Sequence, residues 1–442
     1  MKRLLPEVLR ASRRIECVSP ALAAVVCLAL SFVPLAGARA ETAAIVHAKA
    51  WTLTDDAALG DATIVITNGK IASVTAGAAV PEGARVIDAR GKVVTPGLMH
   101  PATQLGLIEV SSAAETKDGG VSAGPLGAAF DVQYAINPNS SLIPLARSDG
   151  LTRAISYPTS TGVAPFAGKG VSLRLVESGD WLDRAGIGVF AVIGDRSSGS
   201  AGGSRAAQWQ LLRIALDNAK AALAKPPDPA TRTPEFVALE PVLAGKVPLA
   251  LSTNRKSDLL QAIRLGKDYS VRIVVIGGAE AWMVAKELAA ARIPVILDPQ
   301  ANLPASFDML GSRLDNAALL RKAGVDIAFC VVGNGIHQSY NAGLSIREGA
   351  GLAVANGLPY IEGLRAITTA PASIWGVAEH YGTLAAGKDG DVVIWDGDPL
   401  EPSALALRVF VQGKEVSLST HQTGLRDRYM PKAGLAPAPR SR

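Results

Sequence analysis

Two of the chain's five histidines stand where a chemical site could form. His100 follows the first strand-like run of the central region, and His337 follows the last one. Imidazole can bind a divalent metal or transfer a proton near neutral pH. With Cys330 or Glu280, these two histidines would make a small metal site or an acid/base site. The remaining histidines are expected to be surface residues: His47, His380 and His421.

Other chemistries lack their sequence signatures. The chain has no G-x-S-x-G turn for a serine nucleophile. Gly202-Gly203 lack the fingerprint of a dinucleotide-binding loop.

Asn254 and Arg255 come directly after a strand-like run at 248–252. Because side chains at strand ends are well placed to contact a ligand, both are predicted to bind one.

Strand-like and helix-like runs alternate through the central region. The strand-like runs are 152–157, 171–176, 188–193, 248–252, 271–276, 294–297 and 325–332. The helix-like runs are 209–224, 257–267, 280–290, 314–323, 345–356 and 359–369. Repeated βα units predict an α/β fold, a (β/α)8 TIM-like barrel over residues 96–384. A doubly wound open sheet is the alternative, but no phosphate-binding glycine loop favours it.

Both ends of the central region are flanked by short β-like runs. These runs are 44–53, 62–66, 71–75, 85–95 and 386–418, with turn signals such as Asn68-Gly69 between them. The two ends are expected to pair as a small composite β-sandwich domain, made of residues 41–95 and 385–420. Residues 421–442 are rich in Pro, Ala and Arg, and are predicted to be a disordered tail.

Residues 1–40 have the pattern of a signal peptide. A basic segment precedes the apolar run 20–36, and Ala38-Arg39-Ala40 fits a cleavage site before Glu41. The apolar run is short for a membrane span, so no stable span is expected after cleavage, although a retained anchor and a twin-arginine route stay open. The protein is therefore predicted to be periplasmic or secreted.

The charge and the cysteine content further limit which functions and which means of stabilisation are expected. The chain has a formal net charge of +5, and most of that excess lies in residues 1–40. The remainder is close to neutral, so nucleic-acid binding is not expected. Cys330 is the only cysteine after residue 40. A single cysteine cannot form an internal disulfide, so stability must come from a packed core.

Several segments resemble the amidohydrolase superfamily. Residues 94–104 read V-T-P-G-L-M-H-P-A-T-Q, where the family runs V-x-P-G-L-I-D-x-H-x-H. Residues 383–400 are similar to the family's closing segment, G-x-x-x-x-G-K-x-A-D-x-V. The internal runs 130–140, 149–155, 166–170 and 251–264 resemble the imidazolonepropionase-like branch. The resemblance covers nearly all of the chain after residue 40 and implies the barrel and a divalent metal at its strand ends.

At each position where the family has a metal ligand, this chain has a residue of another type. The two histidines of the first strand correspond to Ala102 and Gln104. Those of the fifth and sixth strands correspond to Ser252 and Gly277. The aspartate of the eighth strand falls at 332–334, which includes no carboxylate. Zinc needs three or four imidazole, thiolate or carboxylate ligands, so no metal ligand and no cofactor are predicted.

Three functions remain open from the sequence. The first is a secreted superfamily protein that has lost its metal centre and acts as a binding or partner subunit, with a small-molecule ligand or an active amidohydrolase paralogue. The second is an active hydrolase of non-peptide or dipeptide-like C–N bonds, using zinc or another divalent metal in a rebuilt site. The third is a structural barrel without a ligand. The predicted ligand-binding residues are Gln104, Ser252, Asn254, Arg255 and Asn334.

Overall fold

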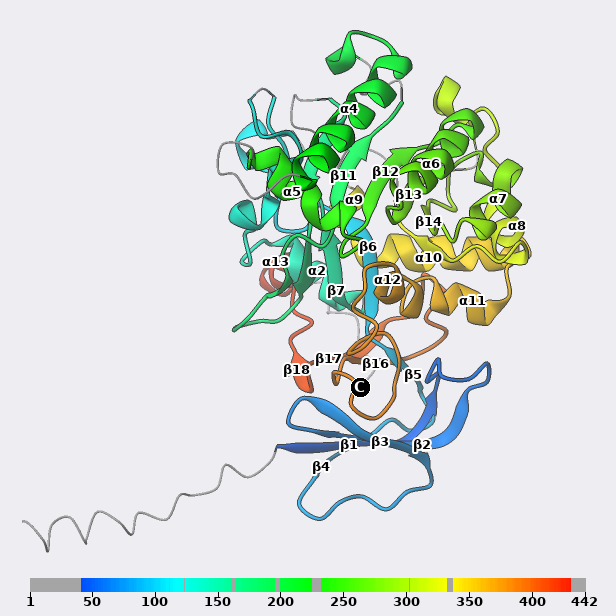
Figure 1. The fold of residues 1–442 in the computed structure, drawn as a ribbon. Coiled ribbons are helices and arrows are strands. Elements are labelled where there is room, and N and C mark those ends of the chain that lie inside the picture. Colours follow the sequence, from blue (N-terminus) through cyan, green and yellow to red (C-terminus); the bar gives the residue numbers. More distant parts are fainter. Residues whose placement is uncertain are drawn as a thin grey trace, which may run out of the picture. The chain divides into compact units, whose positions relative to one another are not determined.

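In a computed structural model, the described part of the chain forms three β-sheets with helices packed around them (Figure 1). The structure describes residues 41–110, 112–122, 124–159, 164–194, 199–224, 232–301, 303–331 and 337–430, without the side chains of residues 337 and 338. Residues Thr42–Arg442 form one compact unit. Among the described helices, none has the length and apolar content to cross a bilayer.

The first sheet joins strands from both ends of the chain. Its order is β18-β17-β16-β5-β1-β2-β3, with β4 paired to β1. The strands are β1 (Thr42–Ala50), β2 (Leu59–Thr67), β3 (Lys70–Ala76), β4 (Arg85–Asp88), β5 (Val93–Pro96), β16 (Val392–Trp395), β17 (Ala406–Val411) and β18 (Lys414–Val416). The key link is β16, which is antiparallel to both β5 and β17. These pairings join both ends of the chain in one sheet, and they do not confirm the two layers of a sandwich.

The β2–β3 hairpin follows directly from its turn residues. Asn68 and Gly69 both have positive φ, at 50° and 80°. Consecutive positive φ values are typical of the type I′ turn, for which Asn-Gly is the preferred pair. A side chain at Gly69 would also lie 2.9 Å from the carbonyl oxygen of Gln412. The predicted turn at Asn68-Gly69 is therefore confirmed, and glycine is required there by both conformation and space.

The central strands form two further sheets. One has the order β10-β9-β7-β6 and the other β15-β14-β13-β12-β11-β8. Their strands are β6 (Leu98–Thr103), β7 (Leu151–Ser156), β8 (Phe166–Lys169), β9 (Val171–Arg174), β10 (Leu182–Arg184), β11 (Val189–Val192), β12 (Leu249–Thr253), β13 (Ile273–Gly277), β14 (Val295–Leu297) and β15 (Ile327–Phe329). Strands β11 to β15 are parallel and adjacent in chain order. A doubly wound sheet reverses its strand order at a switch point, and this sheet does not.

Helices connect and cover these strands; Figure 1 shows α6, for example, beside β12 and β13. They are α2 (Leu142–Ser148), α4 (Arg205–Leu223), α5 (Pro234–Leu243), α6 (Lys256–Tyr269), α7 (Ala285–Ala290), α8 (Asn316–Lys322), α9 (His337–Tyr340), α10 (Ala342–Ala355), α11 (Tyr360–Arg365), α12 (Thr369–Ile374) and α13 (His421–Tyr429). Helix α13 has a capping box at Thr420 and Thr423. The prediction of a disordered tail from residue 421 is thus corrected for α13, and residues 431–442 lie outside the described part.

A closed barrel is not confirmed by the strand pairings. Between β7 and β11, where the predicted barrel needs a parallel strand, the chain forms two antiparallel strands. Strand β8 pairs with β11, and β9 pairs with β7. Only Gly170 separates β8 from β9, and a side chain there would lie 2.6 Å from the ring of Phe190. Between β6 and β15 the described residues form no ladder. The amides of Met99 and Phe329 donate instead to the carbonyls of Ile367 and Ala366, at 2.9 and 3.2 Å.

Successive residues of the parallel strands face two different apolar clusters. In β12, Ala250 points to one cluster, whereas Leu249 and Leu251 point to the other. We call the first the inner cluster; the other lies against the helices. The inner cluster consists of Met99, Ala102, Ile155, Ala167, Ile187, Phe190, Ala250, Val274, Ile276, Ile296, Ala328, Cys330, Ala372, Ile374, Trp375, Val377 and Tyr381. Burial on both faces explains why these strands read as continuous apolar runs.

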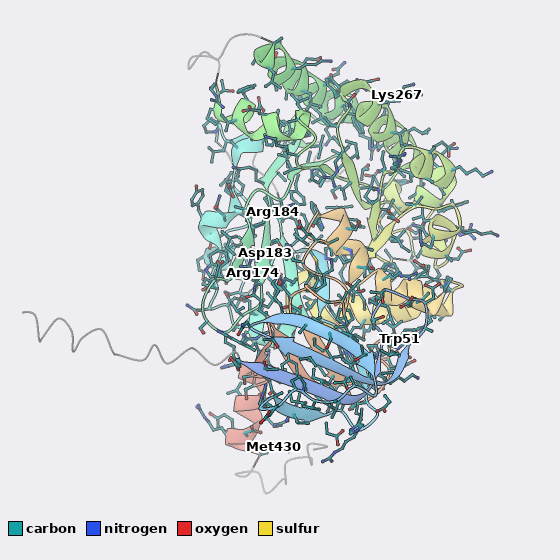
Figure 2. The ribbon with its side chains drawn as sticks, turned by 60° about the horizontal axis from the view of Figure 1, so that its bottom comes forward. Trp51, Arg174, Asp183, Arg184, Lys267 and Met430 are labelled. Atoms are coloured by element: carbon teal, nitrogen blue, oxygen red, sulfur yellow. The ribbon has the colours of Figure 1, made fainter. Side chains whose placement is uncertain are left out.

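A buried ion network joins the second sheet to the segment before β16. The guanidinium of Arg153 on β7 donates to Asp183 at 2.8 Å, to Asp391 at 3.1 Å and to Asp389. Arg174 pairs with Asp183 at 2.9 Å, and Figure 2 shows these two side chains together. Burial alone would lower the pKa of Arg153, but Asp391, Asp183 and Asp389 outweigh it and raise the pKa. The network therefore stays charged and ties distant parts of the chain together.

Candidate functional site

The predicted site residues lie at the carboxyl ends of the parallel strands. Gln104 follows β6, and Ser252 lies in β12. Asn254 and Arg255 come directly after the end of β12. Glu280 follows β13. These ends are where an α/β fold positions its functional side chains. Two further predicted residues are not placed: Asn334 and the side chain of His337 lie outside the described residues.

The end of β6 is buried. Ala102 is 1% exposed and belongs to the inner cluster. Gln104 is equally buried, and its Nε2 has no hydrogen-bond partner among the described residues. The pairing of β6 with β7 is irregular between His100 and Thr103. The first of the family's histidine positions therefore carries a methyl group inside the core.

His100 is enclosed and neutral. Its Nδ1 accepts a hydrogen bond from the amide of Ala102 at 3.2 Å, and its Nε2 has no partner in the described part of the chain. Complete burial lowers the pKa of His100 to about 3. At physiological pH the ring therefore does not carry the second proton that a general acid would donate. His100 is thus unsuited to general acid catalysis near neutrality.

Glu280 has a structural task. Its Oε2 accepts the amide of Lys256 at 2.8 Å, at the start of α6, and its Oε1 accepts the amide of Gly311 at 3.2 Å. A carboxylate at a helix start is stabilised by the unpaired amides there. No hydrogen bond or ion pair connects Glu280 with His100 among the described residues. The predicted site of His100 and His337 with Glu280 stays a prediction, because the side chain of His337 lies outside the described residues.

The sixth-strand position cannot carry a side chain in this backbone. Gly277 has a φ of +103°, and a Cβ there would lie 2.6 Å from Oδ1 of Asn254. That oxygen accepts the amide of Ala279 at 3.2 Å. Asn254 thus fills the space that a histidine at 277 would need. Ser252, two residues after Ala250 on β12, is directed to the inner side but brings only a hydroxyl.

The described residues do not fit a divalent metal of the family's kind. They contain no group of three or more His, Cys, Asp or Glu side chains placed to hold an ion. Cys330 belongs to the inner cluster, and burial, followed by the nearby Asp298, raises its pKa well above the usual thiol value. A protonated thiol is a poor zinc ligand.

Three aromatic side chains stack in and beside the inner cluster. Phe190 on β11 lies between Tyr157 and Trp375, with ring centroids 5.1 and 5.4 Å apart. The indole nitrogen of Trp375 donates to the carbonyl of Pro101 at 2.9 Å. The ring of Phe190 is therefore packed between two other aromatic side chains.

A polar pocket lies beside the ends of β12, β13 and β14. Its polar lining residues are Asn254, Asp298, Arg313 and Asn316. Asn316 donates through Nδ2 to the carbonyl of Gly278 at 3.0 Å, while its buried Oδ1 has no partner among the described residues. Asn254 was predicted from the sequence. The other three were missed because they follow β14 in a long loop without a recognisable motif.

A second polar cluster lies next to the pocket. Asp308 pairs with Arg205 and, at 3.7 Å, with Arg255. Asp258 pairs with Arg205 at 3.4 Å and accepts the indole N–H of Trp209 at 3.0 Å. Arg255, a predicted ligand-binding residue, is thus partly engaged by Asp308. Its side chain is 37% exposed and can still reach a ligand.

Comparisons with known proteins agree with the fold and with the sequence motifs. Residues 255–418 match the model of the Amidohydrolase family. A stretch of 57 residues is 44% identical to the amidohydrolase tasK of Hapsidospora irregularis. That stretch covers 13% of this chain, and the chain spans only 6% of the length of this curated relative.

Solved structures resemble the chain over most of its length. An amidohydrolase from Thermotoga maritima superposes with a TM-score of 0.77 at 23% identity, covering 85% of this chain and 99% of that one. A prolidase complexed with N-methylphosphonate-L-proline gives 0.52 at 16% identity, with coverage of 85% and 99%. Residues 255–418 are therefore similar in sequence to the amidohydrolase family, and the chain is similar in fold to the solved structure of an amidohydrolase.

Proposed function

We propose that this protein is an amidohydrolase-family protein without the family's metal centre, and that it acts as a binding or partner subunit. The observation that carries the proposal is the state of the ligand positions: Ala102 is packed in the inner cluster, and Asn254 occupies the space beside Gly277. An active amidohydrolase paralogue is the proposed partner. A small polar molecule at the pocket of Asn254, Arg313 and Asn316 is the proposed ligand.

The chemical consequence of lost ligands is large. A catalytic zinc lowers the pKa of its bound water from about 15.7 to about 7, which corresponds to roughly 12 kcal/mol of activation. Ser252 and Gln104 can orient a water molecule by hydrogen bonding, but neither is basic enough to deprotonate it. The rebuilt hydrolase site is less favoured because His100 and Glu280 are committed to backbone groups. The structural barrel without a ligand is less favoured because the polar pocket leaves a buried amide oxygen of Asn316 unpaired.

The purified protein is expected to contain far less than one zinc per chain and to show no metal-dependent hydrolysis of C–N bonds. Elemental analysis after gentle purification tests this, with a metal-containing amidohydrolase purified in parallel as the positive control. The proposal is abandoned if one metal per chain is found and a hydrolase activity disappears both on chelation and in His337→Ala. That combination would mean that the ligands lie in a relocated site.

Export of the protein is a separate proposal, supported by the sequence of residues 1–40. The chain isolated from the periplasm or the medium is expected to begin at Glu41, because Ala38-Arg39-Ala40 satisfies the small-residue rule for signal peptidase. Intact mass of that form measures the start. Recovery of a membrane-bound species that retains residues 1–40 would instead identify an anchor.

A further inference from the structure

Two asparagine side chains hold the same peptide group in the wall of the polar pocket. The Oδ1 atom of Asn254 accepts the amide of Ala279 at 3.2 Å, and Nδ2 of Asn316 donates to the carbonyl of Gly278 at 3.0 Å. The peptide between Gly278 and Ala279 is thus bound at both of its polar groups. These bonds also fix which way each asparagine carboxamide is turned. Asn254 therefore offers its NH2 group to the pocket, and Asn316 offers its oxygen.

The oxygen of Asn316 lacks a hydrogen-bond donor. Asn316 is 5% exposed, and its Oδ1 has no partner among the described residues. A buried acceptor left without a donor is destabilising, because it has given up its hydrogen bond to water. The residue lines the pocket, so a molecule bound there can supply the missing N–H or O–H. The first requirement on a ligand is therefore a hydrogen-bond donor.

The charges in the pocket lining add a second requirement. Asp298 lies in the lining. Burial raises the pKa of the nearby Cys330 thiol, and the negative charge of Asp298 adds to that effect. A carboxylate can accept about four hydrogen bonds, so Asp298 can receive one from a ligand. The guanidinium of Arg313, in contrast, is already bound at two points by Asp315. The lining therefore favours a positively charged donor over an anion.

The size of the pocket limits which group can enter it. The cavity has about 10 Å³ for the centre of a water-sized group, which is room for roughly one such group. A primary ammonium group is of this size, and it carries several donors and no acceptor. A guanidinium is a wider planar group and exceeds this space. The size and the charge of the pocket thus point to the same chemical group.

We infer that the pocket binds the primary ammonium group of a small amine. The inference rests on the proposed function, which places a small polar ligand in this pocket. One ammonium N–H donates to Oδ1 of Asn316, and another donates to the carboxylate of Asp298. The NH2 group of Asn254 can then donate to an oxygen atom beside the amine. A short amino alcohol satisfies all of these side chains.

Molecules of similar size and different charge test the inference on the purified protein. They are ethanolamine, ethylene glycol with a hydroxyl in place of the ammonium, and glycolate with a carboxylate in its place. NMR titrations at about pH 7, where an alkyl amine is protonated, measure their affinities. Ethanolamine is expected to bind about tenfold more tightly than either of the others. It is also expected to shift the amide signals of Gly278 and Ala279.

Asp298→Asn removes the charge of the lining but keeps its shape. The variant is expected to bind ethanolamine roughly tenfold or more weakly and to bind ethylene glycol like the wild type. Asp326→Asn is the matched control, because it makes the same change of charge before β15, at the opposite ends of the strands, on a side chain that is 74% exposed. The control is expected to bind every probe like the wild type.

Other results overturn the inference. If ethanolamine binds no more tightly than ethylene glycol, or if no probe binds, the pocket takes only water, and a preference for glycolate reverses the charge argument. Unchanged ethanolamine binding in Asp298→Asn, or an equal loss in Asp326→Asn, places the binding elsewhere. These results leave the proposed loss of the metal centre untouched, whereas one zinc per chain contradicts that loss whatever the amine does. If Asp298→Asn does not fold, the order of the wild-type affinities and the position of its shifted amides decide.

Discussion

Replacing Arg153 with methionine is expected to lower the free energy of unfolding by about 3–5 kcal/mol, as for other buried ion pairs that lose one partner. Arg153 is fully buried and donates to three carboxylates, those of Asp183, Asp389 and Asp391. Methionine fills a similar volume but leaves these acids without their shared cation. Asp183 keeps Arg174, and Asp389 keeps Lys70. Among the described residues, Asp391 keeps only the amide of Gln412.

The effect is expected to depend on pH. Burial would raise the pKa of Asp183, but Arg153 and Arg174 outweigh it and lower the pKa below the usual value. In the wild type this carboxylate therefore contributes stability above the unfolded pKa of about 4, and the contribution is lost as pH falls below it. The difference between wild type and variant is thus fully present above about pH 4 and shrinks as the pH falls below it.

Urea titrations at about pH 7 and about pH 3 measure the loss of stability and its pH dependence. Arg213→Met is the matched control, since Arg213 pairs with Asp268 at 2.9 Å but the two side chains are 33% and 49% exposed. Exposed pairs contribute about 0–1 kcal/mol, so the control should unfold almost like the wild type. A loss below about 1 kcal/mol in Arg153→Met, or an equal loss in the control, would show that the network adds nothing.

The second half of the fold was predictable because each unit is local. The runs at 248–252, 271–276 and 294–297 correspond to β12, β13 and β14, and the predicted helix at 257–267 corresponds to α6. These strands are buried on both faces, which gives short continuous apolar runs, while α6 has one apolar face. The chain order of the sheet follows from successive crossovers of one hand.

The antiparallel insertion was not predictable from patterning. The sequence predicts one strand here, at 171–176, whereas the structure has two: β8 joins β11 and, after Gly170, β9 joins β7. The alternation of side chains does not reveal whether a strand pairs parallel or antiparallel, since both have a period of two. The closed barrel is therefore not confirmed at this point, where no helix separates successive strands.

The candidate site was predictable only in part, because some of its residues are brought together only by the folded chain. Asn254 and Arg255 follow a recognisable strand, and the structure brings both to the polar region at the strand ends. Asp308 and Asn316 reach the same region from a long loop, so only the folded chain shows their proximity. His100 was predicted to face a pocket, but the irregular pairing of β6 leaves it enclosed. Burial of a single polar residue in a strand cannot be read from spacing alone.

Deleting residues 386–442 is expected to give an insoluble product. The deletion removes β16, which lies between β5 and β17, together with the fully buried Trp395 and Phe410. Loss of a buried large aromatic side chain alone costs about 3–5 kcal/mol, and the total stability of a protein is about 5–15 kcal/mol. Removal also leaves the edge of β5 unpaired, and an unpaired edge is a template for aggregation.

The same deletion removes polar partners deep in the fold. Arg153 loses Asp389 and Asp391, and the buried guanidinium of Arg347 loses its three acceptors, the carbonyls of Pro399, Glu401 and Ala404. An unpaired buried charge is strongly destabilising. The fraction of soluble protein and its melting curve measure the result. A chain ending at Thr420 is the matched control, because α13 has no buried residue and its hydrogen bond from Gln422 to Tyr340 is exposed. That control should stay soluble and melt like the intact chain, whereas a soluble 1–385 fragment with a cooperative transition would disprove the idea that the two chain ends fold as one unit.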